Sequence, residues 1–162
     1  MQPVRKILVG VDFSAGGAVA LDYGAGLAEL LGGAELVLAH VLEPVPAPAD
    51  ATWAVDLVEL ERQLEESAAK RLDELATAYG AGKVRITLEI RRGVPYRELV
   101  DAASDLACDL IVLGTHGRSG LSHMLLGSTA ERVVRHAACP VLTIRYRGRH
   151  EEDKRPETSA AG

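Results

Sequence analysis

The sequence predicts an α/β protein in a single domain: a doubly wound five-stranded parallel sheet of order 3-2-1-4-5 with four helices. The first observation is that five strand-like runs alternate with four helix-like segments along the chain. The second is the length of 162 residues, which suits one hydrophobic core. The third is that the runs at 7–11 and 109–114 are continuously apolar, as in strands buried on both faces.

We expect residues 1–146 to form the domain and residues 147–162 to be a charged flexible tail without periodicity. Between the two central strands and after them, the remaining elements are expected in chain order. They are a helix over 15–31, a strand over 35–42, a proline-rich loop over 43–50, a helix over 52–79, a strand over 83–90, a helix from 93–95 to 107, a glycine-rich loop over 114–127, a helix over 128–136 and a strand over 140–145.

The first predicted helix has clear end signals but a weak interior. Ser14 stands at the N-cap position and Gly32-Gly33 follows the last turn. Glycine lowers helix propensity, so this helix must depend on packing. The glycines concerned are Gly17, Gly24 and Gly26.

The second predicted helix carries an apolar stripe at steps of three and four residues, and the strand after it alternates in polarity. The stripe consists of Leu57, Leu60, Leu64, Ala68, Leu72, Leu75 and Tyr79. The strand at 83–90 alternates, which favours a sheet edge with one face only partly covered. With 7–11 and 109–114 in the centre, these patterns give the order 3-2-1-4-5, whose switch point lies between strands one and four.

Charge and composition exclude several classes of protein. The net charge of −5 argues against a general nucleic-acid binder. Residues 110–149 are nevertheless basic, with six arginines and one acid, and for four of these arginines we expect mere coating of a helix and an edge strand. Those four are Arg132, Arg135, Arg145 and Arg147. No apolar run is long enough for a membrane span and no secretion signal is visible, so we expect no membrane partner.

The two cysteines, Cys108 and Cys139, lack partners at metal or redox spacing. We expect both to be small buried thiols in a reducing cytosol, which favours a cytoplasmic protein. His40 follows an apolar run and is expected to be a satisfied core histidine.

The segment from Gly114 to Thr129 carries the chemistry, because it leaves a buried strand and ends at a helix start. Backbone N–H groups of such a loop and of the first helical turn can converge on one anion. We expect Gly114, Gly117 and Gly127 to approach phosphates closely and to adopt positive φ, and Ser128 and Thr129 to add hydroxyl donors. The alternative is a glycine-rich surface loop with an ordinary serine cap.

Competing motifs can be excluded from the residues. A Walker A loop needs a lysine here, and all four lysines lie elsewhere; the dinucleotide fingerprint is missing after the first strand. His116 and His123 have no nearby acid or cysteine for a zinc site. Without paired carboxylates or an activated nucleophile, the sequence predicts no catalytic residue and no protein metal site.

These residues resemble the universal stress protein family. Its nucleotide-binding members carry Gly-x2-Gly-x9-Gly-[Ser/Thr], which appears here as Gly114-x2-Gly117-x9-Gly127-Ser128. The family's Val-Asp-x-Ser appears as Val11-Asp12-Phe13-Ser14. Further matching pieces lie at 38–41, 93–95 and 139–142, so the resemblance covers about residues 4–146.

The resemblance implies a cytoplasmic, dimeric, ATP-binding regulator of the stress response, with the last strand paired across a two-fold axis and an unknown regulatory partner. It implies that Asp12 and Val41, the latter through its backbone, flank adenine and ribose. Gly114 would lie near the ribose. The residues implied around the phosphates are Thr115, His116, Gly117, Gly127, Ser128 and Thr129.

Alternatives remain open at several of these positions. A divalent metal such as Mg²⁺ or Mn²⁺ would be carried by the phosphates. Asp12 could instead cap the first helix, and His116 and Arg118 could be exposed without a ligand. The second function is slow ATP hydrolysis or self-phosphorylation, with Ser122, Ser128 or Thr129 as acceptor. A third is a nucleotide-free dimerising scaffold.

Overall fold

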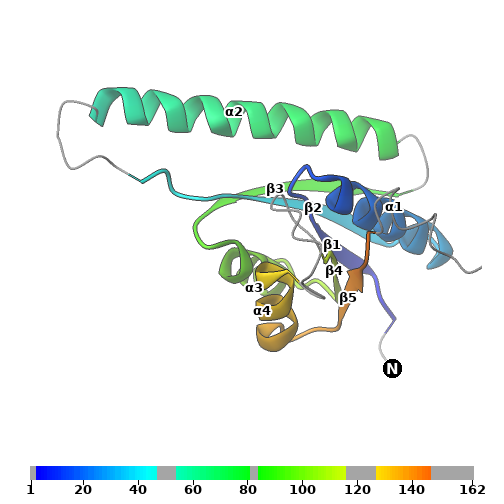
Figure 1. Ribbon diagram of the computed structural model, residues 1–162. Helices are drawn as coiled ribbons and strands as arrows, with labels where there is room; N and C mark the ends of the chain where they lie inside the picture. Colours follow the sequence, from blue (N-terminus) through cyan, green and yellow to red (C-terminus); the bar gives the residue numbers. More distant parts are fainter. Residues whose placement is uncertain (1–2, 47–53, 81–83, 116–126, 147–162) are drawn as a thin grey trace, which may run out of the picture.

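The computed structural model describes residues 3–46, 54–80, 84–115 and 127–146. Within them, five parallel strands form one sheet of order β3-β2-β1-β4-β5, which confirms the predicted fold class and strand order (Figure 1). The strands are β1 (Lys6–Gly10), β2 (Glu35–Leu42), β3 (Ile86–Arg92), β4 (Leu110–Gly114) and β5 (Val141–Ile144). The helices are α1 (Ala15–Leu30), α2 (Ala54–Tyr79), α3 (Pro95–Asp105) and α4 (Ser128–His136).

Helices cover both faces of the sheet, with α1 and α2 on one face and α3 and α4 on the other (Figure 1). Successive residues of central strand β1 point to opposite layers. Ile7 and Val9 pack into the core under α1 and α2, and Leu8 packs into the core under α3 and α4. A strand that must fill both cores is apolar at every position, which is why its sequence predicts its place.

Helix α1 begins as predicted and lies very close to the sheet. Ser14 is the N-cap, and its hydroxyl oxygen accepts a hydrogen bond of 3.0 Å from the Gly17 N–H. A Cβ atom on Gly24 would lie 2.6 Å from Cγ2 of Val9. The glycine that weakens the helix therefore allows its close approach to β1.

The exposure predicted for the third strand is wrong. We expected residues 83–90 to alternate between a covered and a wet face; the strand is instead Ile86–Arg92, and its first six residues are all partly buried. Helix α2 lies over one face of β3 and α3 contacts the other, which evens out the exposure. The edge position is confirmed, and the Arg92 guanidinium pairs there with Glu61 and Glu65 of α2.

The apolar stripe of α2 is used unevenly. Ala68 and Leu72 are buried against the sheet, whereas Leu60 and Leu64 are exposed, because the N-terminal part of the helix extends past β3 (Figure 1). The predicted tail at 147–162 lies outside the described residues. No helix in the described part of the chain is long and apolar enough to cross a membrane.

Both cysteines are free thiols in the core under α3 and α4, but only Cys108 is fully buried; Cys139 is half-buried. Burial raises the pKa of the Cys108 thiol to about 11 and also raises that of Cys139. Both thiols are therefore protonated, and poor nucleophiles, at neutral pH.

Candidate functional site

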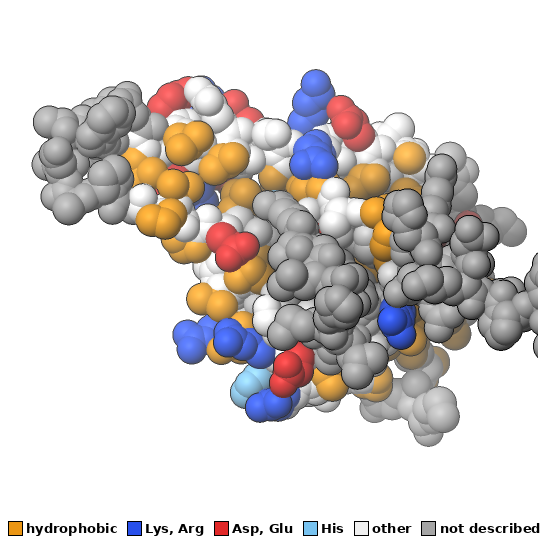
Figure 2. All heavy atoms as spheres, viewed as in Figure 1, with side chains coloured by type: hydrophobic (Ala, Val, Ile, Leu, Met, Phe, Trp, Pro, Cys, Tyr) orange, Lys and Arg blue, Asp and Glu red, His pale blue; other side chains and the backbone are white. Residues whose placement is uncertain are grey.

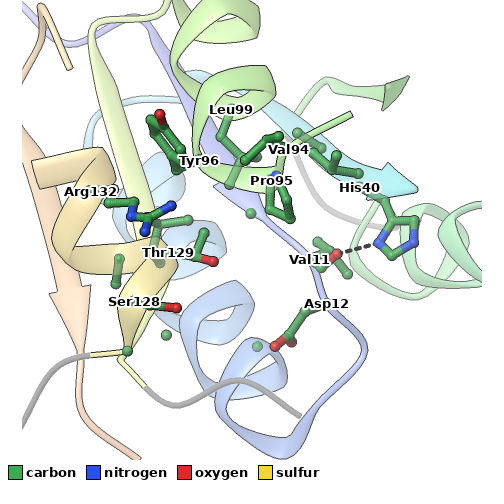
Figure 3. Close-up of a pocket in the computed structure, with 18 of the residues that line it drawn as sticks. Val11, Asp12, His40, Val94, Pro95, Tyr96, Leu99, Ser128, Thr129 and Arg132 are labelled. Atoms are coloured by element: carbon green, nitrogen blue, oxygen red, sulfur yellow. Dashed lines mark hydrogen bonds between the residues drawn. The ribbon is translucent and has the colours of Figure 1, made fainter. Parts of the chain in front are cut away.

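A cleft with a cavity volume of about 470 Å³ opens at the carboxyl ends of β1, β2 and β4. Neighbouring strands β1 and β4 lead to helices on opposite faces of the sheet, so this is the topological switch point where such folds bind ligands. The turn after β1, the end of β2 and the first turns of α3 and α4 line the cleft (Figure 3). The sequence therefore predicted its position correctly.

Asp12, in the turn after β1, lines the cleft and also orders the start of α1. Its Oδ1 atom accepts hydrogen bonds from the Ser14 N–H at 2.9 Å and from the Ser14 hydroxyl at 2.6 Å. Phe13 between them has a φ of 60°, a left-handed conformation that the turn imposes. Asp12 thus combines the position of a ligand contact with the capping role that was its alternative.

The end of β2 places a backbone edge in the cleft. The Val11 N–H donates to the Ala39 carbonyl at 2.8 Å, and the buried ring of His40 donates from Nδ1 to the Val11 carbonyl at 2.6 Å (Figure 3). Alternation along the strand points the N–H and C=O of Val41 to the same side as those of Ala39. No backbone hydrogen bond among the described residues joins Val41 to β1, because β1 has ended at Gly10.

His40 is a satisfied core histidine, as predicted, with 4% of its surface exposed. Its ring lies 4.6 Å from the ring of Phe13, and the guanidinium of Arg71 lies 3.8 Å from the centre of that phenylalanine ring. His40 therefore fixes both the Val11 carbonyl and the turn that carries Asp12.

The expectation of positive φ at the motif glycines is wrong for Gly114 and Gly127. Gly127 has a φ of −65°, and Gly114 is the last residue of β4. What requires glycine is close packing within the chain. A Cβ atom on Gly114 would lie 2.8 Å from the Gly16 carbonyl oxygen, and one on Gly127 would lie 2.7 Å from that of Thr115.

These close contacts bring the start of α4 next to the end of β4. The Gly127 N–H donates to the buried Thr115 carbonyl at 2.6 Å, and the Thr115 N–H donates to Ile144 at 2.9 Å. Thr115 and Gly127 therefore line the cleft side by side. His116 and Gly117, like Arg118 and Ser122, lie outside the described residues.

Ser128 and Thr129 occupy the first turn of α4 and line the cleft, and their hydroxyls lie on its side in Figure 3. The N-cap of α4 is Gly127 and makes no side-chain capping bond, so Ser128 is not the ordinary cap of the alternative interpretation. The first N–H groups of a helix have no partner within the helix. This end of the cleft consequently combines hydroxyl and backbone donors.

Sequence reasoning missed Arg132, which we expected only to coat the helix. Among the described residues that line the cleft, Arg132 is the one lysine or arginine. Its guanidinium carbon lies 5.2 Å from the centre of the Tyr96 ring at the start of α3. The overlooked signal was spacing, because positions 128 and 132 lie on one face of a helix. Arg135, in contrast, pairs with Glu131 at 2.8 Å, as expected for a surface arginine.

The cleft is electrically polar. Asp12 and Glu43 follow β1 and β2, whereas Arg132, Ser128 and Thr129 lie across from Asp12 on α4 (Figure 3). An apolar wall from the start of α3 stands between them; it consists of Val94, Pro95, Tyr96 and Leu99. No group of three or more His, Cys, Asp or Glu in the described part of the chain is placed to hold a metal ion. The arrangement suits a ligand with donors at one end, a flat apolar middle and an anion at the other end.

A doubly wound parallel sheet with an open crevice beside its first strand defines a class of small α/β ligand-binding domains. Residues 3–145 match the universal stress protein family, and the chain belongs to that family. It is 38% identical to universal stress protein MJ0531 of Methanocaldococcus jannaschii over 115 residues, which are 69% of this chain and 65% of that protein.

Solved structures share this fold. Protein MJ0577 of the same organism superposes with a TM-score of 0.81 at 27% identity, covering 91% of this chain and 99% of that one. A universal stress protein in complex with cAMP (TM-score 0.64, 24% identity, 89% and 98% covered) and one from Arabidopsis thaliana with AMP bound (0.58, 20%, 96% and 99%) are more distant. At that distance they establish the common fold alone.

Proposed function

We propose that this protein binds an adenine nucleotide, ATP, in the cleft at the carboxyl ends of β1 and β4 and acts as a nucleotide-dependent regulator of the stress response. One observation carries the proposal: the cleft has carboxylates on one side and an arginine with helix-terminal donors on the other. ATP has the same sequence of groups, with donors on base and ribose and an anionic phosphate chain.

The base would lie against the backbone edge of Val41. The N–H and C=O of this residue can bond the ring nitrogen and amino group of adenine, and Pro95 and Leu99 supply apolar contact. The carboxylate of Asp12 can accept a hydrogen bond from a ribose hydroxyl. The α4 side would then receive the phosphates, with Gly114 near the ribose.

The phosphates would lie over the first turn of α4. Ser128 and Thr129 can donate hydroxyl hydrogen bonds there, and the positive end of the helix dipole favours an anion. We infer that Mg²⁺ or Mn²⁺ would accompany ATP through the phosphate oxygens, since this cation keeps water and phosphate ligands rather than an all-protein cage. His116 and Gly117 complete this part of the proposed site.

Isothermal titration calorimetry with ATP tests the proposal. The wild-type protein should bind ATP at one site per chain, and the pair of changes Ser128→Ala and Thr129→Val should weaken binding roughly tenfold, since a hydrogen bond to a charged group is worth about 1.5 kcal/mol or more. Ser104→Ala, an exposed serine on α3, is the matched control and should bind like wild type. A wild-type protein that takes up no ATP would refute the proposal.

A catalytic use of the site is the second candidate, and the hydroxyls of Ser128 and Thr129 beside the proposed phosphates favour it. Phosphoryl transfer to either hydroxyl would release ADP and a proton to solvent. Incubation with labelled ATP followed by mass spectrometry distinguishes the two functions. A phosphopeptide spanning 128–129, or turnover above buffer, would replace the regulator by a slow enzyme.

We also propose that two copies pair through β5, which would form the dimer that presents nucleotide-dependent surfaces to a regulatory partner. Strand β5 is the sheet edge opposite β3, and Leu142 on it is exposed. An apolar edge strand with free backbone groups invites pairing with another strand. A two-fold axis would satisfy both edges at once.

A further inference from the structure

Arg132 is held at the mouth of the cleft by an aromatic surface and not by an acid. Its guanidinium lies over the ring of Tyr96, and no carboxylate among the described residues forms an ion pair with it. A guanidinium stacked on a tyrosine keeps all its N–H donors in the plane of the stack. The side chain is thus ordered without being neutralised.

Helix geometry directs this arginine toward the proposed phosphates. Side chains on a helix point toward its N-terminus, and position 132 follows position 128 by one turn on the same face. Figure 3 shows the Arg132 side chain on the same side of the cleft as Ser128 and Thr129, reaching toward Tyr96 and the space before α3. An anion held by the first turn of α4 would therefore be within its approach.

Other cations strengthen the positive potential around the tyrosine. The guanidinium carbon of Arg97 lies 5.7 Å from the Tyr96 ring centre, and the ring of His136 lies 5.7 Å from it. Figure 2 shows basic side chains gathered beside a histidine over α3 and α4. The acidic groups of the cleft, Asp12 and Glu43, belong to the turns after β1 and β2.

We propose that Arg132, positioned by Tyr96, selects nucleotides that carry a 5′ phosphate chain over the nucleoside and over a cyclic monophosphate. This inference rests on the proposed nucleotide site. A phosphate chain extends from the ribose along α4 and offers a terminal group with several free oxygens to the planar fork of an arginine. The phosphate of a cyclic nucleotide is tied to the ribose and carries a single charge, so it gains little from Arg132.

Calorimetric titration of ATP, cAMP and adenosine into wild type, Arg132→Gln and Arg135→Gln tests the proposal. Arg132→Gln should weaken ATP binding roughly tenfold or more, and should leave adenosine and cAMP within about a factor of two. Arg135→Gln is the matched control, since it removes the same charge from the same helix at a residue paired with Glu131. It should leave all three ligands within about a factor of two.

Tyr96→Leu tests the positioning role. It should lower ATP affinity by a smaller factor than Arg132→Gln, and in combination with Arg132→Gln it should cost little more, because the two residues act together. The increase of ATP Kd with sodium chloride should be shallower in Arg132→Gln than in wild type. Thermal unfolding of each variant checks that the fold is retained.

The outcomes separate the two proposals. Unchanged ATP binding in Arg132→Gln, or an equal loss for ATP and adenosine, would overturn the role of Arg132 while the nucleotide site stands. Equal losses in Arg132→Gln and Arg135→Gln would reduce the effect to net charge and would also overturn it. A wild-type protein that binds none of the three ligands would refute the proposed function, and this inference with it.

Discussion

Two glycines of α1, two positions apart, should respond oppositely to alanine. Gly26 is exposed, and a Cβ atom there would meet nothing within 4 Å. Gly26→Ala should therefore gain the full difference in helix propensity, about 1 kcal/mol in the free energy of unfolding. For a chain of this size that corresponds to a rise of roughly 2–4 °C in Tm.

Gly24→Ala gains the same propensity but meets the core. Its Cβ would lie 2.6 Å from Cγ2 of Val9, a residue of β1 with 0% of its surface exposed. Valine is stiff at χ1 and cannot turn away, so overpacking should cost about 1–3 kcal/mol. The net change is a loss of about 1 kcal/mol, and the two variants should differ by about 2 kcal/mol.

Urea denaturation followed by far-UV circular dichroism measures both variants against wild type. Equal slopes of unfolding free energy against urea would show that the comparison concerns stability alone. The reasoning would be wrong if Gly24→Ala stabilised the protein as much as Gly26→Ala. In that event the close approach of α1 to β1 would not be what requires glycine at position 24.

Three further outcomes are expected. Gly17→Ala places a methyl group against Oδ1 of Asp12, so calorimetry should record weaker ATP binding with a largely retained Tm; unchanged affinity would count against Asp12 as a ligand contact. Burial raises the pKa of Cys108 to about 11, so the folded state keeps a proton that the unfolded state loses near its ordinary pKa of 9.0. The free energy of unfolding should therefore fall between pH 9 and 11, and the fall should be shallower in Cys108→Ala; an equal slope would contradict this. Leu142→Asp on β5 should halve the mass measured by analytical ultracentrifugation, whereas Val58→Asp on exposed α2 should not; an unchanged mass in Leu142→Asp would place the dimer contact elsewhere.

The layout of this protein could be predicted because it depends on periodicities that a local stretch of chain carries. Strands β1 and β4 are continuously apolar since each contributes to two cores, and this places them in the centre of the sheet. Ser14 is recognisable as a cap because its hydroxyl bonds a backbone N–H three residues away. The edge position of β3 followed from its polar residues, although its burial did not, because the covering helices are distant in sequence.

The sequence by itself thus determined the fold class, the strand order and the place of the cleft, all of which follow from local pattern and chain order. The tertiary structure alone decided how the cleft is built. Gly114 and Gly127 are glycines because backbone from other segments lies against them, and not because their φ is positive. Arg132 faces the cleft because Tyr96, 36 positions earlier in the sequence, gives it a surface to stack on. His40 leaves the edge of Val41 open because it binds the Val11 carbonyl across the sheet. Contacts between distant segments leave no periodic trace in either segment, and only packing brings them together.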